Sequence, residues 1–238
     1  MDYKFTIIVP VYNEEDNIER LEKELVAYLE LALVSTKILI INDGSTDASQ
    51  SLIEAICHKH FNFDYVLFEK NQGLSAALKA GFDLATTELV GYIDADLQTS
   101  PKDFNLLLEY SSDYDLVTGV RLNRKDHFIK KLSSKIANRI RRLFTQDGMD
   151  DTGCPLKVIK TEYAKRIIMF KGLHRFLPAL VLLQNGRIKQ VPVNHFPRIA
   201  GTSKYGLRKR LFAPLADCFA YVWMKKRMLH YKIAKKSF

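Results

Sequence analysis

The sequence has only three cysteines, Cys57, Cys154 and Cys218, and they lie far apart. An odd number at this spacing argues against a disulfide framework, and the lack of a CxxC pair argues against the common cysteine zinc and redox sites. We therefore expect three reduced thiols in a cytosolic protein.

A secretory signal and a membrane span are also missing from the sequence. The chain leads directly into the strand-like run Phe5–Val9, without the basic region and cleavage site of a signal peptide. The longest apolar candidate, Leu211–Met224, is shorter than the roughly 20 residues that cross a bilayer, and it contains Pro214 and Asp217. We expect no transmembrane helix.

Acidic residues are fewer than basic residues. The 238 residues include 36 Lys and Arg against 27 Asp and Glu, a net charge of +9, while the hydrophobic share of 47% is ordinary for a globular protein. This length fits one large domain, or one domain with a smaller appendage. The basic excess favours an anionic partner, such as nucleic acid, a phosphorylated ligand or a membrane surface.

Two periodicities alternate in the first half of the chain, because short β-rich runs are separated by apolar residues at helical spacing. The expected strands are Phe5–Val11, Lys37–Asn42, Tyr65–Glu69, Leu89–Asp94 and Asp115–Val120. The expected helices are 18–29, 52–56 and 73–85, and a fourth that Ser100-Pro101 opens. Asn13 is expected to cap the first helix. The alternation predicts an α/β fold with a mainly parallel sheet covered on both faces.

The second half is more irregular and more basic. Arg121–Arg142 has helical spacing from Phe128 and is either a phosphate site or only a solvated face. The later elements are expected to be a polar turn and strand at 151–160, a helix at 174–183, a strand at 188–193 and a loop at 194–206. We expect one compact unit, residues 1–206, followed by an amphipathic helical segment, residues 207–238.

Acidic residues follow strand after strand, at the edge of the sheet where α/β proteins bind ligands. The sharpest cluster is Asp94-Ala95-Asp96-Leu97-Gln98. Its carboxylates and amide oxygen suit Mg²⁺ or Mn²⁺, which takes its other ligands from phosphate and water. A strand exit that caps the next helix would explain the same residues. The chain has no GxGxxG or GxxxxGK[ST] motif, so dinucleotide and P-loop sites are poorly supported.

Two other strand ends carry candidate ligands. Asp43, followed by Gly44-Ser45, could accept hydrogen bonds from a base or ribose, or could cap a helix that starts near Asp47. Tyr12, within Pro10–Glu14, could stack on a base or be an ordinary surface tyrosine. Each segment is ambiguous by itself.

Together, these segments resemble the family 2 glycosyltransferases of the GT-A fold, which carry a VPxYNE opening, a DGS turn and a DxD motif. The DADLQ sequence at 94–98 is similar to the polyprenyl-phosphate hexosyltransferase branch, typified by dolichyl-phosphate mannose synthase. Later motifs match that branch in order at Thr118–Arg121, Lys131–Asn138, Asp151–Cys154 and Arg198–Tyr205. The resemblance covers about residues 4–220.

The resemblance implies a role for each matching residue. Those implied to bind the donor are Pro10, Tyr12, Glu14, Asp43, Asn71, Gly73, Lys79, Asp94, Ala95 and Asp96. Those implied to hold the metal are Asp94, Asp96 and Gln98. Those implied to cradle the acceptor phosphate are Arg121, Lys130, Ser134, Arg198, Ser203 and Lys204. Those implied to be catalytic are Asp94, Asp96, Arg121 and Arg198. Lys130 stands where close relatives carry arginine, so it keeps the charge but loses the bidentate fork.

The implied reaction moves a hexose from a nucleotide sugar to a polyprenyl phosphate, with Mg²⁺ or Mn²⁺, in cell-envelope glycan biosynthesis. GDP-mannose is favoured by analogy, and UDP-glucose is also compatible. The nucleophile would be a phosphate oxygen that is already ionised at neutral pH, so no general base is required. Attack opposite the leaving group would invert the anomeric centre and give a β-linked product.

The sequence leaves the roles of two histidines and of the C-terminal segment undecided. His174 either touches a substrate or only starts a helix, and His195 is equally undecided. The apolar and basic residues of Leu207–Phe238 suit a helix on an anionic membrane surface, which predicts a peripheral protein at the cytoplasmic face. A partner membrane protein could hold the segment instead, or the helix could pack on the catalytic domain.

Two other functions compete with lipid-phosphate glycosylation. A family 2 transferase with a sugar or polysaccharide acceptor would need a base rather than a basic cradle. An inactive nucleotide- or nucleic-acid-binding protein would fit the charge but would leave the DxD cluster unexplained, and the chain has no aromatic platform motif for RNA. We therefore expect an enzyme that does not bind nucleic acid.

Overall fold

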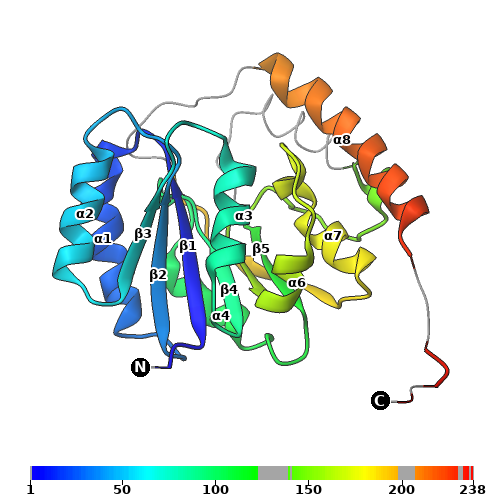
Figure 1. The fold of residues 1–238 in the computed structure, drawn as a ribbon, viewed down its shortest axis with the longest axis horizontal. Helices are drawn as coiled ribbons and strands as arrows, with labels where there is room; N and C mark the ends of the chain where they lie inside the picture. Colours follow the sequence, from blue (N-terminus) through cyan, green and yellow to red (C-terminus); the bar gives the residue numbers. More distant parts are fainter. Residues whose placement is uncertain are drawn as a thin grey trace.

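The computed structural model describes residues 2–122, 139, 141–197, 207–229, 233–235 and 237. Within these residues, seven strands form one sheet in the order β3-β2-β1-β4-β6-β5-β7 (Figure 1). The strands are β1 (Phe5–Val11), β2 (Thr36–Asn42), β3 (Phe63–Leu67), β4 (Leu89–Tyr92), β5 (Leu116–Arg121), β6 (Lys157–Lys160) and β7 (Ile188–Val193). The helices are α1 (Glu15–Leu29), α2 (Ser49–Lys59), α3 (Leu74–Leu84), α4 (Phe104–Leu108), α6 (Thr161–Arg166), α7 (Leu177–Leu183) and α8 (Leu207–Arg227). Two 3₁₀ turns, η1 (Pro101–Asp103) and η2 (Leu173–Phe176), precede α4 and α7.

Helices cover both faces of the sheet, which is therefore the middle of three layers. Successive residues of a strand face opposite sides and so pack in different layers. In β1, Ile7 and Val9 pack in a buried cluster with α1, α2 and α4, whereas Ile8 packs with α3, α7 and α8. Helix α3 lies very close to β1 at Gly81, where an added Cβ would stand 2.7 Å from the side chain of Ile8. The absence of a side chain at Gly81 therefore sets the distance between α3 and the sheet.

The predicted α/β class with a mainly parallel sheet is confirmed. Strands β3, β2, β1 and β4 pair in parallel, as do β5 and β7. The exception is β6, which runs antiparallel to both of its neighbours, β4 and β5. Strands β4 and β5 therefore point the same way on either side of β6, so that their carboxyl ends lie at the same edge of the sheet.

Local predictions were wrong at three places. Glu14, not Asn13, is the N-cap of α1, because Asn13 has a φ of 50° and its side-chain oxygen accepts a hydrogen bond from the N–H of Thr46 at 2.8 Å. Strand β3 begins at Phe63, two residues before the predicted run. Helix α6 was not expected. For Asn13, a contact with a distant segment, rather than local spacing, decides the outcome.

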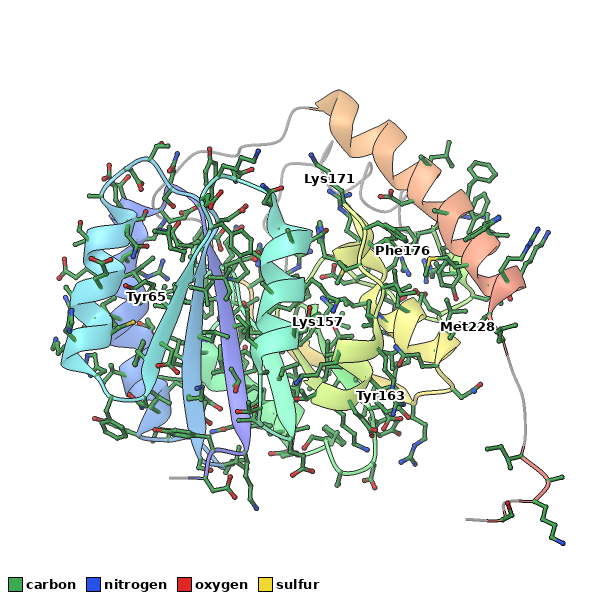
Figure 2. The ribbon with its side chains drawn as sticks, in the orientation of Figure 1. Tyr65, Lys157, Tyr163, Lys171, Phe176 and Met228 are labelled. Carbon is green, nitrogen blue, oxygen red and sulfur yellow. The ribbon has the colours of Figure 1, made fainter. Side chains whose placement is uncertain are left out.

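Helix α8 packs on the layer that contains α3 and α7. Its residues Cys218 and Tyr221 are 2% and 1% exposed, and the Tyr221 ring stacks on that of Phe176 at a centroid distance of 6.2 Å. Phe176 is labelled in Figure 2. The predicted domain boundary at residue 206 lies outside the described residues, so this division stays a prediction. Among the helices that the structure describes, none combines the length and the hydropathy needed to cross a membrane.

Candidate active site

The polar loops predicted to bind ligands come together at one edge of the sheet, the upper edge in Figure 1. Strands β2, β1 and β4 are neighbours and run in parallel. The loops that follow them, which contain Asp43, Tyr12 and Asp94, are therefore adjacent. This is the position at which α/β sheets bind ligands.

Asp43 holds the loop that opens α3. Its carboxylate accepts hydrogen bonds from the N–H groups of Gln72 and Gly73 at 2.7 and 2.8 Å, and from the side-chain amide of Asn71 at 2.8 Å. At Gly44, where φ is +68°, an added Cβ would stand 2.5 Å from the carbonyl carbon of Lys70. The structure thus brings Asp43, Asn71 and Gly73 together, as the donor-site prediction requires. Asp43 shapes the loop, and a direct contact with base or ribose stays a prediction.

The alternative interpretation of Asp43, as a cap for α2, is wrong. The N–H of Ser49 at the start of α2 donates to Asp47 at 3.0 Å. Asp47 also accepts from the N–H of Glu15 at 3.2 Å, and Glu15 accepts in return from Ala48 at 2.8 Å. These reciprocal bonds join the loop after β1 to the loop after β2.

The loop after β1 is fixed in the same way. The N–H groups of Asn13 and Glu14 donate to Ser45 and Ser49, both at 3.0 Å. Pro10 and Tyr12 are half-buried on either side of Val11. The residues predicted to meet the donor nucleotide therefore lie on a backbone that the loop after β2 and the first residue of α2 hold in place.

The DxD loop leaves the buried end of β4. Ala95, Asp96 and Leu97 are 3%, 6% and 2% exposed, and Leu97 adopts a φ of 49°. The N–H of Gln98 donates to Asp96 at 3.2 Å, and the guanidinium of Arg20 donates to the carbonyls of Asp96 and Leu97 at 3.5 Å. A leucine with positive φ is unusual and persists only where its surroundings enforce it, so this turn is built to a fixed shape.

The donor set of this loop fits a hard divalent cation. Asp94, Asp96 and Gln98 offer carboxylate and amide oxygens, the ligand type that Mg²⁺ and Mn²⁺ prefer. The part of the chain that the structure describes contains no cluster of three or more His, Cys, Asp or Glu side chains suited to a metal. A cation that takes its remaining ligands from phosphate and water needs only such a partial set.

Arg121 is fixed by an acid that sequence reasoning did not single out. Its Nε and Nη2 donate to the two carboxylate oxygens of Asp151 at 2.7 and 2.9 Å. The two side chains are 14% and 9% exposed. Asp151 belongs to the motif Asp151–Cys154, so the signal was present, but nothing in the sequence indicated its partner.

Strands β4 and β5 are separated only by β6, which places their ends about 10 Å apart. The charges of Asp94, Arg121 and Asp151 all act on the phenol of Tyr92 at the end of β4, where burial raises its pKa. The Arg121–Asp151 pair therefore lies at the same edge of the sheet as the DxD loop, across one intervening strand.

The segment after β7 also docks on the DxD loop. The N–H of Phe196 donates to the carbonyl of Gln98 at 2.9 Å, and Nδ1 of His195 lies 3.1 Å from the same oxygen. Because a carbonyl can only accept, His195 carries its proton on Nδ1 in this contact. The five predicted acceptor-site residues that lie outside the described residues are Lys130, Ser134, Arg198, Ser203 and Lys204.

His174 is tied to the first turn of α3. Its Nδ1 lies 2.8 Å from the hydroxyl of Ser75, which also accepts from the N–H of Gly172 at 3.0 Å. Burial lowers the pKa of His174 to about 3, aided by the positive charges of Arg175 and Lys157. His174 is therefore a neutral hydrogen-bonding group near pH 7, not the exposed histidine of a simple helix start.

Lys79 is not brought to the Asp43 loop. It lies six residues beyond Gly73, about 9 Å along α3, and pairs with Asp83 of the same helix. Its Nζ also lies 3.5 Å from the carbonyl of Lys165. A role for Lys79 in donor binding stays a prediction, and these contacts do not favour it.

Comparison with known proteins agrees with this geometry. Residues 6–168 match the family model for glycosyl transferase family 2. The chain belongs to glycosyl transferase family 2. It is 33% identical over 219 residues to undecaprenyl-phosphate 4-deoxy-4-formamido-L-arabinose transferase of Sodalis glossinidius, a match that spans 90% of this chain and 67% of that protein.

Solved structures show the same fold. Glucosyl-3-phosphoglycerate synthase from Mycobacterium tuberculosis, in complex with Mn²⁺, UDP and glucosyl-3-phosphoglycerate, superposes with a TM-score of 0.72 at 15% identity, over 96% of this chain and 81% of that one. The mannosyltransferase PcManGT from Pyrobaculum calidifontis, in complex with GDP-Man and Mn²⁺, gives 0.69 at 19% identity, over 92% and 64%. The predicted family and GT-A fold are thus confirmed.

Proposed function

We propose that this glycosyltransferase moves a sugar from a nucleotide sugar to a polyprenyl phosphate. The observation that carries the proposal is the Arg121–Asp151 pair, which holds a guanidinium in one orientation at the same edge of the sheet as the DxD loop. A fixed guanidinium suits a phosphate acceptor, because its planar N–H groups donate to phosphate oxygens in a set direction, whereas a neutral hydroxyl acceptor would need a base. The name of the relative from Sodalis glossinidius, which specifies undecaprenyl phosphate, supports the same acceptor class.

On the donor side, the nucleotide would lie over Tyr12, Glu14 and the loop that Asp43 holds. Asp94, Asp96 and Gln98 would hold Mg²⁺ or Mn²⁺, which when bound supplies positive charge to the diphosphate. The fold neighbours are complexes with UDP and with GDP-Man, so both bases are consistent with this fold. We keep GDP-mannose as the favoured donor by analogy and UDP-glucose as the alternative.

The chemistry needs little from the protein beyond charge and position. An ionised oxygen of the acceptor phosphate attacks the anomeric carbon, the bond from that carbon to the diphosphate breaks, and the nucleoside diphosphate leaves. Arg121 orients the attacking phosphate and offsets its repulsion from the diphosphate. Attack opposite the leaving group inverts the anomeric centre, so an α-linked donor gives a β-linked lipid phosphate sugar.

The same proposal places the protein on the cytoplasmic face of a membrane through α8. Leu215, Phe219 and Trp223 are spaced four residues apart and are 39%, 60% and 64% exposed, so they form one outward apolar stripe. The helix ends in Lys225–Arg227, all exposed. Apolar side chains beside a basic cluster suit the interface of an anionic bilayer, where a lipid-linked acceptor would reside.

The deciding experiment offers radiolabelled nucleotide sugars to the protein with undecaprenyl or dolichyl phosphate and Mg²⁺ or Mn²⁺. Lipid-linked product from one donor is expected, and Asp96→Ala and Arg121→Ala should abolish it. Arg166→Ala, which removes an exposed arginine paired with Glu162, serves as the matched control and should keep full activity. Transfer only to water or to a soluble sugar would overturn the lipid-phosphate proposal and favour a sugar acceptor.

A further inference from the structure

Lys157 is a lysine buried in the middle of the sheet, beneath the active site. It belongs to β6, pairs in register with Tyr92 of β4, and is 0% exposed. Figure 2 labels Lys157 among the central elements of the molecule. Its Nζ lies 5.3 Å from the centre of the Tyr92 ring. Full burial of an ammonium group is costly, so such a lysine requires close compensation.

The compensation comes from one turn. Nζ of Lys157 donates to the backbone carbonyl of Thr152 at 3.3 Å and to that of Cys154. Both carbonyls belong to the segment that carries Asp151. The lysine thus holds the turn through two of its carbonyls, while the first residue of the turn, Asp151, holds Arg121.

Lys157 lies beside the end of β4 that leads into the DxD loop, because it pairs in register with Tyr92. Burial lowers the pKa of Lys157 to about 8, and the negative charges of Asp151 and Asp94 act in the opposite direction. The Arg121 guanidinium also rests on the same turn at Gly153, where an added Cβ would stand 3.1 Å from Nη2. A displacement of the turn would therefore displace Arg121.

We propose that Lys157 is a positioning residue, which holds the Asp151–Cys154 turn so that Asp151 can fix Arg121 for the acceptor phosphate. The contact network is independent of the reaction, whereas the part that concerns the acceptor rests on the proposed function. A purely structural lysine would act on stability alone, so the two interpretations predict different measurements.

The first test reads the Arg121–Asp151 pair directly. In ¹⁵N spectra of arginine side chains, the Nε–H signal of Arg121 is assigned from its loss in Arg121→Lys. We expect Lys157→Met to shift this signal toward that of a solvated arginine and Lys157→Arg to retain it. Lys160→Met, a control on the same strand that breaks the ion pair with Asp115, should leave it unchanged. An unchanged signal in Lys157→Met would overturn the proposal.

The second test separates acceptor from donor. Lys157→Met should raise the KM for polyprenyl phosphate about tenfold, within the range of coupling inside one hydrogen-bonded network, and leave the donor KM within about twofold. In a double-mutant cycle with Asp151→Asn, the two effects should not add, because both act through Arg121. Additive effects, or a loss of thermal stability with unchanged KM, would overturn the positioning role.

Failure of the variant to fold and failure of the proposed function can each be told apart from failure of the positioning role. If Lys157→Met does not fold, Lys157→Gln, which keeps a hydrogen-bond donor without the charge, replaces it in both tests. If the wild-type protein forms no lipid-linked product, the proposed function fails, and the Arg121 signal still decides the role of Lys157.

Discussion

Asp43 at the end of β2 accepts a hydrogen bond from the N–H of Gly73 at 2.8 Å, and so joins the sheet to the first turn of α3. The same carboxylate accepts from Gln72 and Asn71, and Asp43 is 3% exposed. One side chain therefore sets the start of α3. Ser75 in that turn bonds His174, so the contacts of Asp43 and His174 meet at the start of α3.

Replacing Asp43 by alanine should destabilise the protein. Three donors lose their acceptor. Because Asn71 and Gln72 are exposed, water can replace part of each bond, so each lost hydrogen bond costs about 1 kcal/mol, and we expect the free energy of unfolding to fall by about 3 kcal/mol. Urea denaturation measures the change. Asp83→Ala, which removes only an exposed ion pair with Lys79, should cost less than about 1 kcal/mol. Equal losses in the two variants would show that the Asp43 network is not important for stability.

Acid should destabilise the protein through His174. Its pKa is about 3 in the folded state, against an ordinary value of 6.5. Between these values the unfolded chain binds a proton that the folded chain does not, so this contribution is complete above pH 6.5 and is lost as the pH falls toward 3. One such group adds a slope of at most about 1.4 kcal/mol per pH unit.

Urea titrations between pH 7 and pH 4.5 test this directly. His174→Gln should show a shallower decline than the wild-type protein, because it cannot take up the proton. His58→Gln, at an exposed position on α2, should keep the wild-type slope. A His174→Gln curve parallel to the wild-type curve would argue that His174 is protonated at its ordinary pKa.

Nucleoside diphosphate should stabilise the protein only together with a divalent cation. A ligand at 100 times its Kd adds about 2.7 kcal/mol to the free energy of unfolding, which raises Tm measurably. We expect this rise with UDP or GDP plus Mn²⁺, and its loss on addition of a chelator. Asp96→Asn should abolish the rise, whereas Asp113→Asn, at an exposed turn, should not. A rise that survives the chelator would show that the diphosphate binds without metal.

The apolar stripe on α8 should bind anionic vesicles. Phe219→Ser and Trp223→Ser should each weaken co-sedimentation by about tenfold, because each removes most of one aromatic side chain from the lipid interface. Lys225→Gln should weaken the free energy of vesicle binding by about 1 kcal/mol, and by less at high salt. Phe61→Ser removes an aromatic ring that is 77% exposed between α2 and β3, and it should bind as the wild type does. Equal weakening at Phe61 would indicate nonspecific adsorption.

Much of this site follows from the sequence because parallel strands place their ends together. The sequence predicted that Asp43 and Asp94 lie at the same edge of the sheet, since both follow apolar runs in a βαβ pattern. The antiparallel direction of β6 could not be predicted, because the sequence of its four residues does not show which way the strand runs in the sheet. The partnership of Arg121 with Asp151, and the burial of Lys157, depend on that direction. Contacts across 30 residues of sequence are decided by the register of the sheet, not by local spacing.

Arg121→Lys tests whether orientation, rather than charge alone, serves the acceptor phosphate. Lysine keeps the positive charge but cannot make the two bonds at 2.7 and 2.9 Å to Asp151. We expect the KM for polyprenyl phosphate to rise about tenfold and the donor KM to stay within about twofold, which is the pattern for a lost interaction with one substrate.

The chain offers a matched control in Arg142. This arginine donates a hydrogen bond of 2.8 Å to Asp150, and both side chains are more exposed than the Arg121 pair. Arg142→Lys makes the same chemical change close by in the sequence, and it should leave both KM values unchanged. If Arg121→Lys behaved in the same way, charge without orientation would suffice. The Asp151 contact would then be a structural pair, and the argument for a phosphate-orienting guanidinium would fail.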